Sequence, residues 1–180
     1  MKKKMSEPLA QNESVQAGEM FDRDLEIELS TRVLRQFRQV FNSVKSHFQQ
    51  IEKKVGVGGA QSWALSVIHK HPGMGTTELA RALDIHQSTA SNLIRSLVSA
   101  GLITTEKSST DRRAVQLFIM PEGQKLLKKI PGPHAGILPH ALTALDQEVL
   151  LRLNDDLGSL LKLIQADEKL AQIPLGLTQK

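Results

Sequence analysis

Hydrophobic positions along the chain fall into runs with helical spacing, interrupted by one pair of β-branched segments. From about Asp22, apolar side chains recur at steps of three and four residues, which places them on one stripe of a helix. These positions are Leu29, Val33, Phe37, Val40, Phe41, Val44, Phe48, Ile51 and Val55. The glycines at 56, 58 and 59 end the run. The pattern predicts a helix of about 30 residues, which is longer than a small domain needs, and therefore a contact with a second subunit.

Shorter elements are predicted between residues 60 and 120. Residues 60–71 form a helix that stops at Pro72-Gly73, and residues 77–83 form a second one that Thr76 or Thr77 can cap. A third helix covers residues 87–100 and ends at Gly101. Two β-branched segments, 102–106 and 114–119, flank a polar loop at 107–113. We therefore expect a β-hairpin with a charged tip.

The last third of the chain is again helical. A basic helix over 124–130 is cut short by Pro131-Gly132-Pro133, Pro139 begins a short turn of helix, and Asp146 caps a long final helix. The apolar stripe of that helix consists of Leu150, Leu153, Leu157, Leu160, Leu161 and Ile164. The predicted organisation is a flexible tail (1–20), a dimerisation helix (21–59), a central domain (60–120), helices of a dimerisation lobe (121–165) and a loose tail (166–180).

Two consecutive helices, a strand pair with a basic tip and a further helix are the order of a winged helix-turn-helix in a mainly α (α+β) chain. In that fold the second helix enters the major groove of DNA, and the hairpin reaches an adjacent groove or the backbone. One face of the helix at 87–100 carries short or forked hydrogen-bonding side chains: Gln87, Ser88, Thr89, Ser91, Asn92 and Arg95. Gln and Asn can pair with adenine and Arg with guanine, although such a face by itself is often only solvated surface.

Charge and composition narrow the function. The 180 residues carry 23 Lys+Arg and 19 Asp+Glu, a net charge of +4, and residues 60–130 alone carry 9 basic and 5 acidic side chains. The basic excess thus lies on the predicted winged helix, where Arg112 and Arg113 at the hairpin tip can enter a narrow minor groove. Cys and Tyr are absent and there is one Trp, which excludes thiol chemistry and disfavours stacking on single strands.

At these residues the sequence resembles a known family. The stretch from Thr77-Glu78-Leu79-Ala80 to Gly101-Leu102-Ile103 is similar to the reading head of the MarR (multiple antibiotic resistance regulator) transcription factors. Asp111-Arg112-Arg113 and the later Pro121-Glu122-Gly123 resemble that family's wing and following helix. The resemblance implies a homodimeric regulator, more often a repressor, with Asp111 orienting Arg113 by a salt bridge. It also implies that a small aromatic or phenolic effector, where one exists, binds between the dimer interface and the DNA-binding lobe.

The site residues that follow are of two kinds. The expected DNA contacts are Thr76, Thr77, Gln87, Ser88, Thr89, Ser91, Asn92, Arg95, Asp111, Arg112 and Arg113. The expected dimer contacts are Val33, Phe37, Val40, Phe41, Leu150, Leu153, Leu157, Leu160 and Ile164.

The chain departs from the family pattern at several positions. Asp84 stands in the inter-helix turn where Gly is usual, although Asp tolerates a left-handed backbone. Asn92 occupies a position that is often Arg, and Pro131-Gly132-Pro133 breaks a helix that commonly continues.

Other functions have weaker support. A winged-helix adaptor that binds protein instead of DNA is the main alternative, and salt dependence separates the two. No carboxylate lies at helical spacing with His69 or His71 and the chain has no Cys, so no metal and no cofactor are expected. No catalytic motif is present, and an enzyme is not expected. Without a secretory signal or a membrane-length apolar run, a soluble cytoplasmic protein is expected.

Overall fold

The computed structural model describes residues 9–107, 115–130 and 132–175, with side chains from Leu25 onward. The chain divides into two units, residues 1–42 and 43–180, which are described separately. Helix α1 (Leu9–Val55) runs through the first unit into the second. It begins well before Asp22, so the prediction of a flexible tail over 1–20 is wrong for residues 9–20, which are helical. None of the described helices is long and apolar enough to cross a bilayer.

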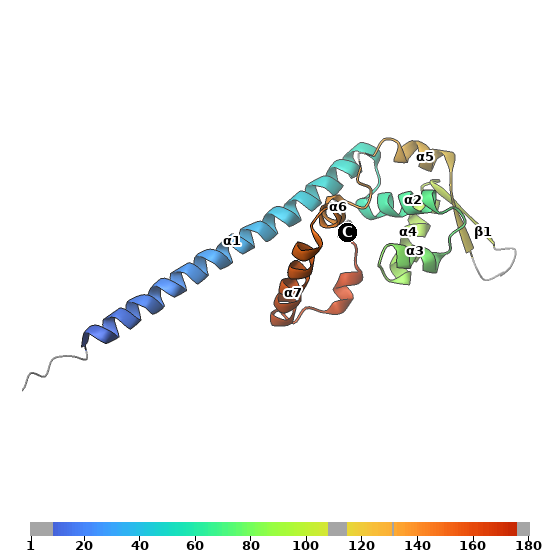
Figure 1. Ribbon diagram of the computed structural model, residues 1–180. Helices are drawn as coiled ribbons and strands as arrows, with labels where there is room; N and C mark the ends of the chain where they lie inside the picture. The colour runs from blue at the N-terminus through green and yellow to red at the C-terminus, as the bar shows by residue number, and fades with distance from the viewer. Residues whose placement is uncertain (1–8, 108–114, 131, 176–180) are drawn as a thin grey trace, which may run out of the picture. The chain divides into compact units, whose positions relative to one another are not determined.

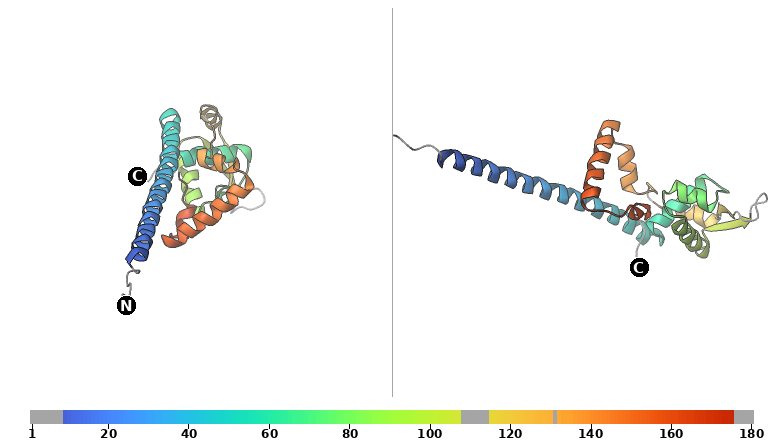
Figure 2. Two further views of the ribbon diagram at one scale, coloured as in Figure 1. Left: turned by 60° about the vertical axis from the view of Figure 1, so that its left-hand side comes forward. Right: turned by 90° about the horizontal axis from the view of Figure 1, so that it is seen from below.

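In the second unit, three helices and a hairpin form the winged helix. Helices α2 (Gly59–Lys70), α3 (Thr76–Ala82) and α4 (Gln87–Ser99) precede strands β1 (Ile103–Lys107) and β2 (Val115–Ile119). The strands are antiparallel, with Ile103 opposite Ile119 and Lys107 opposite Val115. The predicted elements are therefore confirmed here to within a few residues. Figure 1 shows the hairpin and the C-terminal helix α7 on opposite sides of helices α2–α4, as does the right-hand view of Figure 2.

The core of this unit is apolar and lies where α2, α3, α4 and the hairpin meet. Its fully buried large side chains include Leu65, Ile68, Leu79, Leu97, Ile103 and Leu117. They come from every element of the winged helix, so each element covers part of the others. The backbone also joins the turn before α3 to the wing, because Gly73 N donates to Leu117 O at 2.8 Å and Leu117 N to Met74 O at 2.9 Å.

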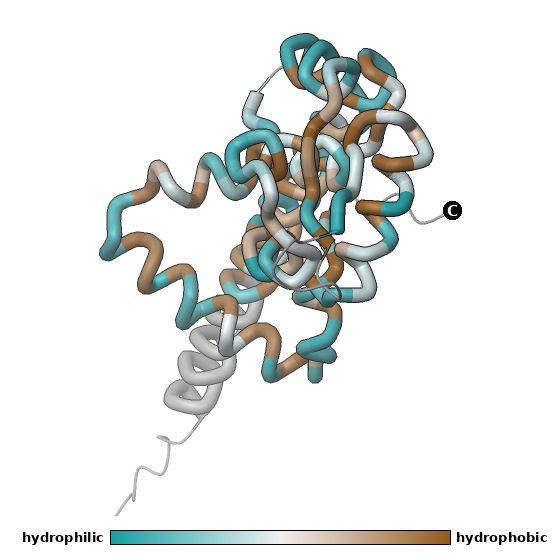
Figure 3. Tube along the Cα trace, turned by 90° about the vertical axis from the view of Figure 1, so that its right-hand side faces the viewer, coloured by the Kyte–Doolittle hydropathy of each residue, from teal (hydrophilic) through white to brown (hydrophobic). Residues whose placement is uncertain are grey.

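The C-terminal part contains helices α5 (Pro121–Leu127), α6 (Ile137–Thr143) and α7 (Gln147–Leu163), then a short 3-10 helix, η1 (Glu168–Gln172). The chain between α5 and α6 contains the Pro-Gly-Pro segment, so the predicted helix break is confirmed. The predicted loose tail is not structureless, because residues 168–172 form η1. Neither α6 nor α7 contains a buried residue. In Figure 3, hydrophobic and hydrophilic positions alternate along the helical turns, as expected of amphipathic helices.

Candidate nucleic-acid interface

Helix α4 has two faces with different chemistry. Ala90, Leu93, Ile94 and Leu97 are buried against the winged-helix core. The other face presents the predicted reading residues: Gln87, Ser88, Asn92 and Arg95 are exposed, and Thr89 and Ser91 are half-buried. The buried face holds α4 in place, while the polar face stays free to contact a ligand. The structure thus brings these predicted side chains together on one surface.

Two hydrogen bonds between side chains organise this polar surface. The amide of Gln87 donates from Nε2 to Thr77 Oγ1 at 3.4 Å, which connects the beginnings of α3 and α4. Arg95 Nη1 donates to Asn92 Oδ1 at 3.1 Å, one helical turn away. Each bond uses only part of the hydrogen-bonding capacity of its residues, since a guanidinium has five N–H donors and an amide has a second donor and an acceptor. The remaining groups can still contact a base edge or a phosphate.

The start of α3 differs from the prediction. Its N-cap is Gly75, so neither Thr76 nor Thr77 caps the helix. Instead the carboxylate of Glu78 accepts a hydrogen bond from the backbone N–H of Gly75 at 2.7 Å. An acidic side chain near a helix N-terminus is favourable for this role because the free amides there are partly positive. The Thr77 hydroxyl therefore accepts from Gln87 and takes no part in capping.

The turn between α3 and α4 depends on Asp84. This residue has a φ of 51°, in the left-handed region that residues other than Gly, Asn and Asp rarely adopt. On either side of it, Leu83 N donates to Leu79 O and Ile85 N to Ala80 O, each at 3.0 Å. Leu83 and Ile85 are both buried. Asp84 therefore adopts the left-handed conformation at the position where the resembled family usually has Gly. Its side chain remains exposed.

Several predicted DNA and dimer contacts do not belong to the surface formed by α3 and α4. The predicted wing-tip contacts Asp111, Arg112 and Arg113 lie outside the described residues. Of the predicted dimer residues in the first unit, Val33, Val40 and Phe41 are exposed, and the rings of Phe37 and Phe41 stack at 6.2 Å. On α7, Leu150, Leu160 and Ile164 are exposed, and Leu153 and Leu157 are half-buried. These apolar side chains have little cover within their own units.

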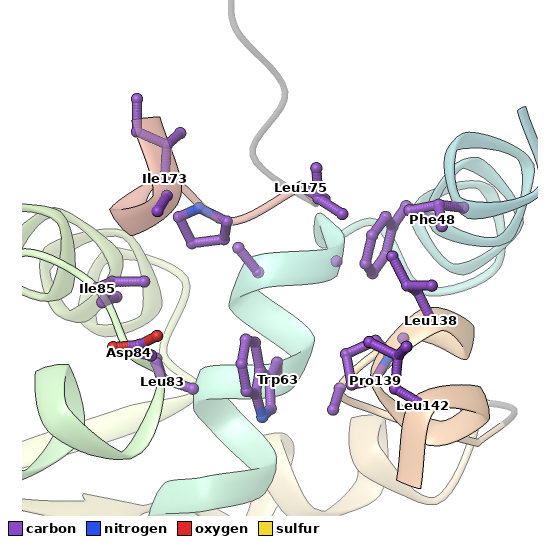
Figure 4. Close-up of a pocket in the computed structure, with 17 residues that line it drawn as sticks. Phe48, Trp63, Leu83, Asp84, Ile85, Leu138, Pro139, Leu142, Ile173 and Leu175 are labelled. Carbon is purple, nitrogen blue, oxygen red and sulfur yellow. The ribbon is translucent and has the colours of Figure 1, made fainter. Parts of the chain in front are cut away.

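The second unit also contains a pocket of about 410 Å³ that the sequence did not predict. Four segments far apart in the chain form it: the end of α1 with Phe48, α2 with Trp63, the α3–α4 turn with Asp84, and α6 with Leu138 (Figure 4). Ala171 of η1 and residues 173–175 after it complete the wall. Trp63 is half-buried, packs against the core and also lines this pocket. No local pattern could have indicated the pocket, because its walls meet only through folding.

The ring of Phe48 packs tightly against two glycines at this pocket. A Cβ added at Gly59 or at Gly136 would run into the Phe48 ring, so the ring lies against both backbones. Gly136 also has a φ of 100°, which only glycine adopts readily. These two glycines therefore allow an aromatic side chain from α1 to pack between α2 and the start of α6.

The loop before α6 contains a histidine in an unusual setting. Burial and the nearby positive charge of Lys70 both lower the pKa of His134, burial having the larger effect. Its Nδ1 atom is buried and has no hydrogen-bond partner within the described residues. The neutral imidazole is therefore favoured in the folded protein.

The fold and the exposed face of α4 define a winged helix-turn-helix protein. A family model described as the MarR family matches residues 55–114, the segment that contains α2, α3, α4 and β1. Over these residues the chain is similar to the MarR family. The resemblance expected from the sequence is thereby confirmed.

Similar proteins carry related names. The chain is 22% identical over 142 residues to the HTH-type transcriptional repressor MdtR of Bacillus subtilis, covering 79% of this chain and 92% of that protein. It is 32% identical over 102 residues to a Thauera aromatica protein named as a transcriptional regulatory protein for the hcr operon, covering 56% of this chain and 57% of that protein. Both names describe regulators of transcription.

Solved structures show the same fold. The S. aureus MepR–DNA complex aligns at 21% identity with a TM-score of 0.53, covering 72% of this chain and 96% of that one. Streptococcus pneumoniae FabT in complex with DNA aligns at 17% identity with a TM-score of 0.51, covering 75% and 96%. At these identities the likeness concerns the winged-helix fold.

Proposed function

We propose that this protein is a sequence-specific double-stranded DNA-binding regulator of transcription, acting as a repressor. The observation that carries the proposal is the polar face of α4, where Gln87, Asn92 and Arg95 are exposed while the opposite face is buried in the core. The match of residues 55–114 to the MarR family model supports it, as do the similarities to the repressor MdtR and to the MepR and FabT structures solved with DNA.

The proposed binding mode follows from the geometry of the fold. Helix α4 enters a major groove, with Gln87, Ser88 and Arg95 contacting base edges and the threonines at 76, 77 and 89 contacting phosphates. We also propose that Arg112 and Arg113, which lie outside the described residues, contact the adjacent minor groove. The exposed apolar stripes of α1 and α7 pair with those of a second copy of the chain. Two-fold symmetry then requires a pseudo-palindromic operator with half-sites about 10 bp apart.

The test begins with selection of preferred duplexes from random DNA by the wild-type protein. We expect one pseudo-palindromic motif and an affinity that falls linearly with the logarithm of the salt concentration. In the Gln87→Ala variant, preference at one operator position should relax, with a loss of about 1–3 kcal/mol against the wild-type base. Fluorescence anisotropy with matched and single-substituted operators measures this loss.

The control for this experiment is Gln147→Ala, which makes the same change at an exposed position of α7. It should keep the wild-type motif and affinity. If Gln87→Ala and wild type select the same motif with equal discrimination, α4 is not the reading helix. If the wild-type protein enriches no sequence and its binding does not respond to salt, it is an adaptor that binds protein.

The pocket beside Trp63 is the proposed effector site. It opens on the α3–α4 turn, so a molecule bound there contacts the backbone that positions α4. We propose that a small aromatic effector binds in it and changes the affinity for DNA.

A further inference from the structure

The residues that line the pocket indicate the charge of its ligand as well as the size. Apart from Asp84, the described lining residues are glycine, proline or apolar, and the two aromatic ones are Phe48 and Trp63. No Lys, Arg or His of the described chain is among them. An aromatic acid placed here would find no cation to pair with its carboxylate and would lie near a second negative charge. Burial of an unpaired charge is costly, and like charges add to that cost.

The same lining favours a positive charge in two ways. The carboxylate of Asp84 attracts a cation, and the ring of Trp63 attracts it through its quadrupole. Figure 4 shows Asp84 on the α3–α4 turn beside Leu83 and Ile85, and Trp63 on α2. The apolar remainder of the wall accommodates the hydrocarbon part of the molecule.

We propose that the pocket binds a small aromatic cation, such as a quaternary ammonium compound, in preference to an aromatic acid, and that Asp84 makes the charged contact. This inference deepens the proposed function, because it rests on the same effector site and names the chemical class of its ligand. It also gives Asp84 a second role. The residue that holds the left-handed turn before α4 is the one that a cationic ligand touches, so ligand binding acts directly on the turn.

The experiment compares three probes with the full-length protein: benzyltrimethylammonium, its uncharged carbon isostere neopentylbenzene, and the anion phenylacetate. The chain has one Trp, so Trp63 gives a single indole N–H resonance that reports on the pocket. We expect the cation to shift this resonance with an affinity about fivefold higher than that of the neutral isostere, the factor that about 1 kcal/mol supplies for an exposed ion pair. Phenylacetate should bind more weakly than both.

Asp84→Asn is the decisive variant, because Asn removes the charge and still tolerates the left-handed backbone. It should bind the neutral probe as the wild type does and lose the preference for the cation. Asp156→Asn, on α7 and outside the pocket lining, should keep the wild-type preference. If circular dichroism shows that Asp84→Asn is unfolded, Asp84→Gly replaces it, since glycine also accepts this φ.

The outcomes separate this inference from the proposed function. Equal affinity of the wild type for the cation and phenylacetate overturns the charge assignment, as does a preference for the cation that survives in Asp84→Asn. If no probe shifts Trp63, the pocket is not a ligand site and this inference fails with it. DNA binding is measured without any of the probes, so its failure would overturn the regulator assignment and leave the ligand result standing.

Discussion

Helices α4 and α7 are both amphipathic, but only α4 buries its apolar stripe within the chain. Ala90, Leu93, Ile94 and Leu97 of α4 are buried, whereas α7 contains no buried residue. Burial of apolar surface is the main favourable contribution to folding, so α4 is stabilised by the winged-helix core. The stripe of α7 gains this stabilisation only when something outside the chain covers it. The comparison teaches that the winged helix is complete in one chain and that α7 is not.

The largest expected effect tests the buried half of this comparison. Leu97 is 0% exposed and Val98, its neighbour, is 41% exposed. Leu97→Ala leaves a cavity in the core and should lower the free energy of unfolding by about 2–5 kcal/mol. Val98→Ala should change it by about 0.5 kcal/mol or less. Urea unfolding of both variants measures the difference, and equal midpoints would show that α4 is not held by its buried face.

The next effect tests the exposed half. Leu150→Asp puts a charge on the apolar stripe of α7, and the proposed dimer should lose about 2 kcal/mol or more of association free energy. Ser159→Asp introduces the same charge on the opposite face of α7 and should leave association unchanged. Sedimentation equilibrium over a range of protein concentrations gives the dimer dissociation constants. A dimer as tight in Leu150→Asp as in wild type would exclude this stripe from the interface.

The smallest effect concerns the loop that joins these two regions of the second unit. The pKa of His134 is lowered in the folded state, so the unfolded state binds the proton more tightly. The stability that the neutral imidazole contributes is therefore complete above the unfolded pKa of about 6.5 and is lost as the pH falls below it. His134→Gln should flatten the dependence of the melting temperature on pH below that value. His140→Gln, on the exposed face of α6, is the control, and identical pH profiles of wild type and His134→Gln would contradict the assignment.

Much of the winged helix could be predicted because its signals are local. The apolar spacing of α4, Gly101 after it and the β-branched runs at 103–107 and 115–119 each act through neighbouring residues. The left-handed turn at Asp84 could be expected from the family resemblance, because Gly is usual there and Asp tolerates a positive φ. The sequence did not predict the first part of α1, because residues 9–20 are helical but carry no apolar stripe.

The sequence by itself thus determined the order of the elements, the resemblance to the MarR family and the polar residues that α4 exposes. Only the tertiary structure decided how those residues are used. It paired Thr77 of α3 with Gln87 of α4, whereas the Asn92–Arg95 bond and the Glu78 cap of α3 each join residues only three positions apart. It also assembled the pocket from α1, α2, the α3–α4 turn, α6 and residues 171–175. Hydrophobic periodicity acts over a few residues, whereas the walls of a pocket come from segments more than 100 residues apart, and packing alone brings them together.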